Sequence, residues 1–96
     1  MYSEYPTLPD FGAFSGARLV ERRPTSRGIG YMYDIMSFRS QQAIEYMDLL
    51  ERHNFAFETS YRSSGYTIIV YKEKSSNLHV QMGIVAGYYT VLAMRL

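Results

Sequence analysis

The sequence predicts an α+β fold: a four- or five-stranded antiparallel sheet with one helix packed on one face. Several segments alternate apolar and polar residues with the period of two that is typical of strands. Short links join them and favour an antiparallel meander. One segment instead carries apolar residues every three or four positions, the period of an amphipathic helix. The expected order is β-α-β-β-β-β, preceded by an irregular N-terminal arm.

Residues 1–28 differ in composition from the rest of the chain and predict this arm. They hold all three prolines and show no sustained period of 2 or 3.6. The arm carries four large apolar side chains, Phe11, Phe14, Leu19 and Val20. These side chains are able to pin the arm to the core, so the arm need not be disordered. The chain therefore divides into an arm, residues 1–28, and a single α+β domain, residues 29–96.

Residues 39–53 predict the one helix. Their apolar positions form a single stripe: Ala43, Ile44, Met47 and Leu50. A single stripe packs the helix against one face of a sheet. The other face of the sheet would then lie open to water or to a partner.

Five segments predict strands because they alternate and are rich in β-branched and aromatic residues. These segments are residues 29–37, 55–61, 66–72, 78–85 and 88–95. Seven of the ten tyrosines fall within them: Tyr31, Tyr33, Tyr61, Tyr66, Tyr71, Tyr88 and Tyr89. Tyrosine joins a large apolar ring to a polar tip, so it suits a core, a partner surface or a platform for nucleic-acid bases.

The composition narrows the classes of function. The chain has 96 residues and no cysteine, which excludes disulfides, thiol catalysis and cysteine-ligated zinc. A net charge of +1 argues against a DNA mimic and against nucleic-acid binding driven by charge alone. The first residues have neither a basic start nor an apolar run, so no signal peptide is expected. We expect a cytoplasmic protein without a membrane partner.

Few residues suggest chemistry. His53 and His79 are the only histidines, and each has an ordinary role, at a helix C-terminus and on a strand. No nucleophile motif is present. Asp34 is the only acid within a strand that has apolar residues on both sides, which makes it the candidate for a small enzyme or small-ligand site. We expect neither a cofactor nor a metal.

The one basic cluster lies in the arm: Arg18, Arg22, Arg23 and Arg27, opposed within this stretch only by Glu21. It is followed by Tyr31 and Tyr33. Arginines next to exposed aromatic rings hold phosphates and stack on bases. The alternative is a solvated arm whose arginine stems cover the apolar body of the sheet.

These observations favour a non-enzymatic protein-binding module, the class that includes virus-encoded inhibitors and accessory proteins. The expected contact residues are Arg18, Arg22, Arg23, Arg27, Tyr31, Tyr33, Arg62 and Tyr66. Tyrosine and arginine dominate such contacts because they supply large area and directed hydrogen bonds. The alternatives are a nucleic-acid-binding module that uses the arginine arm and the tyrosine face, and a small enzyme or ligand binder around Asp34. A homodimer formed through sheet faces or edge strands is a further expectation.

Overall fold

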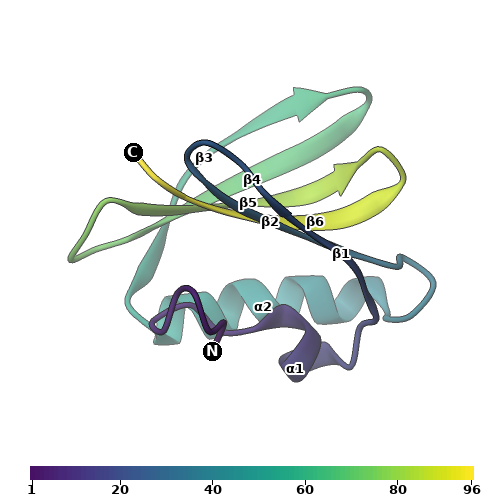
Figure 1. The fold of residues 1–96 in the computed structure, drawn as a ribbon, viewed down its shortest axis with the longest axis horizontal. Coiled ribbons are helices and arrows are strands. Elements are labelled where there is room, and N and C mark those ends of the chain that lie inside the picture. Colours follow the sequence, from purple (N-terminus) through teal and green to yellow (C-terminus); the bar gives the residue numbers. More distant parts are fainter.

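The computed structural model describes residues 1–96, which form two helices and six strands (Figure 1). The helices are α1 (Phe11–Ser15) and α2 (Ser40–Arg52). The strands are β1 (Leu19–Pro24), β2 (Gly28–Tyr33), β3 (Phe55–Ser63), β4 (Tyr66–Glu73), β5 (Leu78–Val85) and β6 (Tyr88–Arg95). Neither helix is long and apolar enough to cross a membrane.

The six strands form one antiparallel sheet in the order β1-β2-β6-β5-β4-β3. The last strand, β6, pairs with β2 near the beginning of the chain, with Tyr31 opposite Val91 and Tyr33 opposite Tyr89. The strands β1 and β3 are therefore the two edges. Hairpins join β3 to β4, β4 to β5 and β5 to β6, as the short links predict.

The α+β class is confirmed, but the sheet has six strands rather than four or five, and there are two helices rather than one. The additional strand β1 and the additional helix α1 both come from residues 1–28, where we predicted an irregular arm. Every residue of β1 is exposed, so burial imposes no alternation on its sequence. The helix α1 has only five residues, too few to show a helical period; the Asp10 side chain caps its start and Gly16 ends it with φ 78°.

The first strand of the predicted set is shorter than expected. The prediction covered residues 29–37, whereas β2 ends at Tyr33. The carboxylate of Asp34 accepts a hydrogen bond from the Met36 N–H, and the Asp34 carbonyl accepts one from the Ser37 N–H. These local bonds turn the chain away from the sheet because an aspartate side chain offers the backbone an alternative to the ladder.

The main core lies between the sheet and a layer made of α2 and the N-terminal segment. In Figure 1 this segment and α1 lie on the same side of the sheet as α2. The segment contributes Tyr2, Tyr5, Leu8 and Phe11 to the buried cluster. Leu8 and Phe11 are fully buried, as are Tyr46 and Leu50 of α2. Residues 1–17 therefore cover a part of the sheet beside β2 that the single long helix leaves free.

The opposite face of the sheet carries no helix. Three buried residues, Met32, Ile68 and Val70, lie outside the main core cluster. They alternate with the core-facing residues of β2 and β4, which places them on this second face. Tyr61 reaches across it from the edge strand, and its hydroxyl donates to Gln81 Oε1 at 2.8 Å.

Candidate functional site

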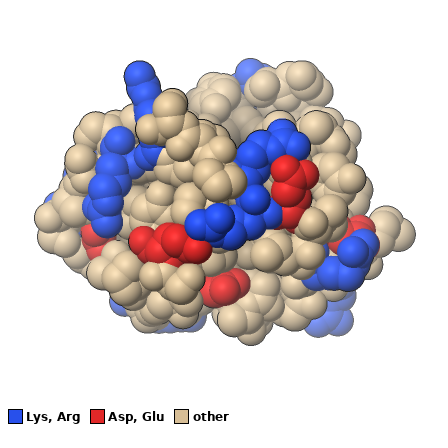
Figure 2. All heavy atoms as spheres, in the orientation of Figure 1, with Lys and Arg blue, Asp and Glu red and all other residues tan.

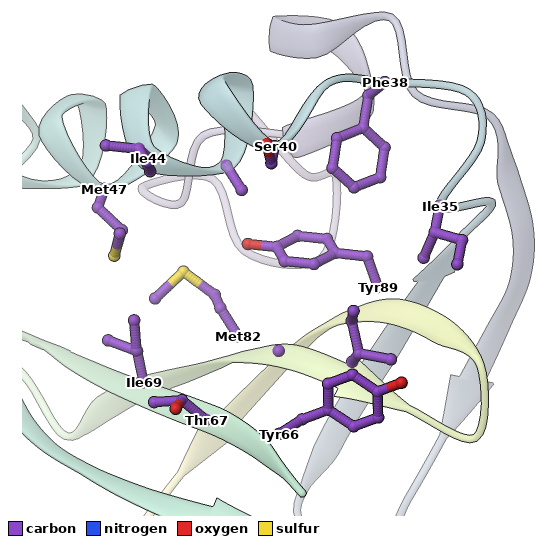
Figure 3. Close-up of a pocket in the computed structure, with 13 residues that line it drawn as sticks. Ile35, Phe38, Ser40, Ile44, Met47, Tyr66, Thr67, Ile69, Met82 and Tyr89 are labelled. Carbon is purple, nitrogen blue, oxygen red and sulfur yellow. The ribbon is translucent and has the colours of Figure 1, made fainter.

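An apolar groove opens between α2 and one end of the sheet (Figure 3). Its volume is about 350 Å³, which falls in the range of small-ligand pockets. One wall comes from α2 and the loop before it, and the other from β4, β5 and β6. The lining residues are Ile35, Phe38, Ser40, Ala43, Ile44, Met47, Tyr66, Thr67, Ile69, Met82, Gly83, Ile84 and Tyr89. None of them carries a charge.

The groove opens to solvent through exposed apolar side chains. We call Ile35, Ile44 and Tyr66 the mouth patch; their exposed fractions are 41%, 52% and 49%. All three line the groove itself. Single exposed apolar residues are common on proteins, whereas a group of them around a concave apolar site indicates a contact surface.

Tyr89 is the one polar group deep in the groove. Tyr89 is 8% exposed, and its ring packs on Phe11 and Phe38 at centroid distances of 4.8 and 5.2 Å. Its hydroxyl has no hydrogen-bond partner in the protein. Every side-chain polar atom that is sealed from solvent does have a partner, so the Tyr89 hydroxyl must be reached by solvent. The hydroxyl therefore touches the open space of the groove. Figure 3 shows it directed toward the side where Met47 and Met82 lie. Burial raises the pKa of Tyr89, so the hydroxyl stays protonated at neutral pH and donates.

Two acids extend the helix wall of the groove. Asp48 and Glu51 lie one turn beyond Ile44 and Met47 and hence on the same side of α2. Neither takes part in an ion pair, in contrast to Glu4, Glu21, Asp34 and Glu58. The Tyr71 hydroxyl of β4 donates to Glu51 Oε2 at 3.4 Å, so this carboxylate faces the sheet. Burial, and then Glu51 and Asp48, raise the pKa of Tyr71. Two carboxylates without an ion pair therefore lie beyond this end of the groove.

The arginine cluster is largely neutralised. Arg18 pairs with Asp34 at 2.7 Å, Arg22 with Glu4 at 2.8 Å and Arg23 with Glu21 at 2.7 Å. Only Arg27, at the turn between β1 and β2, has no ion pair. Figure 2 shows basic and acidic side chains next to one another on the visible face, without a broad area of one sign.

Tyr31 and Tyr33, which we expected at a contact surface, lie in the core with 3% and 1% exposure. The ring of Tyr2 stacks on Tyr31 at 3.9 Å, and the hydroxyls of Tyr2 and Tyr33 pair at 2.6 Å. Tyr31 donates to Glu4 at 2.7 Å. The N-terminal segment folds over both rings, so neither is accessible to a partner while this segment stays in place. The sequence of a tyrosine-rich strand does not indicate whether another segment of the chain covers its rings.

The other expected contact residues are accessible. Arg62 lies at the tip of the β3–β4 hairpin and donates to the Gly65 carbonyl at 2.7 Å. Tyr66 begins β4 and belongs to the mouth patch. The structure does not bring these two together with the arginines of β1, which lie on the opposite edge of the sheet.

Asp34 has a structural explanation. Its carboxylate accepts hydrogen bonds from the Met36 N–H and from Arg18, and these bonds lower its pKa. A lowered pKa keeps the carboxylate ionised, the opposite of what a general acid needs at neutral pH. His79 pairs with Glu58 at 3.0 Å. No group of three or more His, Cys, Asp or Glu side chains has the arrangement of a metal site.

Sequence reasoning missed the groove. Its central residues, Tyr89 and Met82, were visible only as core-type residues of strands, and Ile44 as part of the helix stripe. One signal was available: the stripe of α2 contains Ala43, and Ser40 precedes it on the same side of the helix, and these small side chains leave space toward the sheet. A search for this chain among protein-family models, curated proteins and solved structures finds no match.

Proposed function

We propose that this chain is a non-enzymatic protein-binding module that contacts its partner through the mouth patch and the groove behind it. The observation that carries the proposal is an uncharged apolar groove with Ile35, Ile44 and Tyr66 exposed at its opening. Exposed apolar area of this kind is costly in water, and a partner removes it from water on binding. A projecting side chain of the partner would fill the groove.

Concave apolar sites ringed by aromatic residues are typical of the pockets that receive anchor residues at protein interfaces. The module would act by occupying a surface of a larger protein, as inhibitors and accessory proteins do. Arg62 and Tyr66 remain candidate contact residues because both are exposed. The four arginines of the cluster in and beside β1 are secondary candidates, since three of their guanidinium groups already pair with acids of this chain.

No specific observation favours the nucleic-acid alternative. Its two central tyrosines are buried, and its arginine cluster is paired with acids. The alternative of an enzyme around Asp34 is disfavoured by the low pKa and the local hydrogen bonds of that carboxylate.

The test is affinity capture from a lysate of the source organism, with and without nuclease, using the wild-type chain and the Ile44→Asp variant. We expect a defined protein that survives nuclease treatment and is lost with Ile44→Asp, because a carboxylate at the groove mouth would be desolvated by the partner. Loss of the captured protein on nuclease treatment would instead support nucleic-acid binding. Light scattering on the same samples measures whether the chain forms a homodimer.

Leu96→Asp is the matched control. Leu96 is 55% exposed, against 52% for Ile44, and lies at the C-terminus away from the groove. It places the same charge at an equally exposed apolar position. The proposal would be wrong if both variants captured the partner as well as the wild-type chain does.

A further inference from the structure

The geometry points to a tyrosine side chain of the partner, with a lysine or arginine near it, as the group that occupies the groove. This inference rests on the proposed function and adds the chemistry of the anchor. It follows from three features: the uncharged walls, the buried Tyr89 whose hydroxyl has no hydrogen-bond partner in the protein, and the carboxylates of Asp48 and Glu51 beyond the end of the groove.

The uncharged walls of the groove indicate that the anchor side chain is neutral and mainly apolar. No lining residue is charged, so a buried ammonium or carboxylate would lose its hydration without gaining an opposite charge. The volume of about 350 Å³ is ample for an aromatic ring, since an apolar cavity of about 150 Å³ takes up benzene. An aromatic ring also matches the rings of Tyr66, Phe38 and Tyr89 around it.

The hydroxyl of Tyr89 decides that the anchor carries a polar tip. A purely apolar anchor would displace water from this hydroxyl and leave it buried without a partner, which costs about 1–3 kcal/mol. Tyrosine avoids this cost because its own hydroxyl lies at the far end of the ring. Serine and threonine are too short to fill the groove, and the tryptophan N–H lies on the side of its ring.

The protein contains the same arrangement in its own core. Tyr2 inserts its ring next to Tyr31, and its hydroxyl pairs with that of Tyr33 at 2.6 Å. A tyrosine from the N-terminal segment thus satisfies a tyrosine of β2. Tyr89 lies directly opposite Tyr33 in the neighbouring strand β6, and its hydroxyl lacks such a partner.

Charge complementarity decides what flanks the anchor. Asp48 and Glu51 continue the groove wall by one helical turn, and neither has a cationic partner in this chain. A lysine or arginine a few residues from the tyrosine would meet them. Such a pair contributes more to orientation and association rate than to affinity, and it weakens with salt.

The test of the polar tip uses the full chain labelled with ¹⁵N and two probes, p-cresol and toluene, which differ by one hydroxyl. Both are titrated into the wild-type protein and into Tyr89→Phe while amide shifts are followed. We expect shifts in α2 and around Met82 and Tyr89. The ratio of the dissociation constants, toluene over p-cresol, should fall about two- to tenfold in Tyr89→Phe, the effect of one hydrogen bond. An unchanged ratio would overturn the tyrosine anchor.

The test of the flanking charge uses the peptides acetyl-Tyr-Gly-Gly-Lys-amide and acetyl-Tyr-Gly-Gly-Glu-amide at low salt. The lysine peptide should bind about two- to fivefold more tightly, as expected for an exposed ion pair. The double variant Asp48→Asn/Glu51→Gln should remove this preference and leave the binding of p-cresol unchanged. Equal binding of both peptides to the wild-type protein would overturn the charged flank.

The two proposals fail in different ways. A partner that is captured by the wild-type chain and lost with Ile44→Asp, together with an unchanged probe ratio, would keep the protein-binding function and overturn the tyrosine anchor. Selective binding of p-cresol without any captured protein would overturn the protein partner and assign the groove to a small phenolic ligand.

Discussion

The space between the sheet and its helical layer is closed in one half of the molecule and open in the other. Beside β2, the N-terminal segment fills it with Tyr2, Leu8 and Phe11, and every buried hydroxyl finds a partner. Beside the ends of β4, β5 and β6 no segment fills it, and the groove remains. Tyr89 marks the boundary, because its ring packs on Phe11 while its hydroxyl faces the groove.

The difference shows how much of a six-stranded sheet one long helix can cover. The 13-residue α2 is too narrow to cover the whole face, so a second covering element is needed. The N-terminal segment provides it for one half only. The closed half therefore supplies stability, and the open half is the one for which we propose binding. The following predictions test this division, from the largest expected effect to the smallest.

The first prediction concerns Phe11, the centre of the closed half. Its ring contacts Tyr33, Phe38, Tyr46 and Tyr89 at centroid distances of 4.8 to 5.2 Å. Phe11→Ala should lower the free energy of unfolding by about 3–5 kcal/mol, measured by urea denaturation, because it removes contacts and leaves a cavity. The control is Phe14→Ala in the same helix, where the side chain is 39% exposed and the loss should stay below about 1 kcal/mol.

The second prediction uses the buried tyrosines of the closed half. Burial raises the pKa of Tyr33 to about 12. In the unfolded chain tyrosine titrates near 10, so between about pH 10 and 12 the unfolded state loses its proton first and the folded state becomes less stable. This residue alone should remove about 2 kcal/mol of stability by pH 12, because each unit of pKa difference between the two states corresponds to about 1.4 kcal/mol. Urea denaturation from pH 8 to 12 measures the slope, and Tyr33→Phe should reduce it; an equal slope in that variant would contradict the assignment.

The third prediction compares hydroxyl groups across the boundary. Tyr2→Phe should lower the free energy of unfolding by about 1–3 kcal/mol, because the Tyr2 oxygen accepts from the Phe11 N–H and pairs with Tyr33. Tyr89→Phe should change it by less than about 0.5 kcal/mol, since the Tyr89 hydroxyl bonds to no protein group. Similar losses for the two variants would mean that the closed and open halves do not differ in this way.

The fourth prediction fills the open half. Ala43 lines the groove from α2 and is only partly buried. Ala43→Leu should raise the free energy of unfolding by about 0.5–1 kcal/mol, since filling a cavity is stabilising when the space is already there. It should also abolish the amide shifts caused by p-cresol. A variant that loses stability would show that the groove closes in solution.

Local periodicity made part of this fold predictable. The helix α2 and the strands β3 to β6 were predicted within a few residues, because each buries one face and therefore carries the period of its backbone. The strand β1 and the helix α1 could not be found in this way. The strand has no buried residue, and the helix has little more than one turn.

The candidate site was less predictable than the fold. Of the expected contact residues, Tyr66 reaches the groove, whereas Tyr31 and Tyr33 are buried by the N-terminal segment. The groove is lined by residues from two segments, 35 to 47 and 66 to 89. A local sequence pattern cannot show that two segments so far apart in the chain come together. The arginine cluster was visible in the sequence, but its pairing with Glu4 and Asp34 was not.

The sequence by itself determined which segments of this chain become α2 and the strands β3 to β6, because backbone geometry imposes its period on neighbouring residues. The tertiary structure alone decided which tyrosines lie in the core and which face solvent. Tyrosine suits both environments, so its role depends on what packs over it. That was decided by the N-terminal segment, which covers β2 and leaves the end of β4, β5 and β6 open.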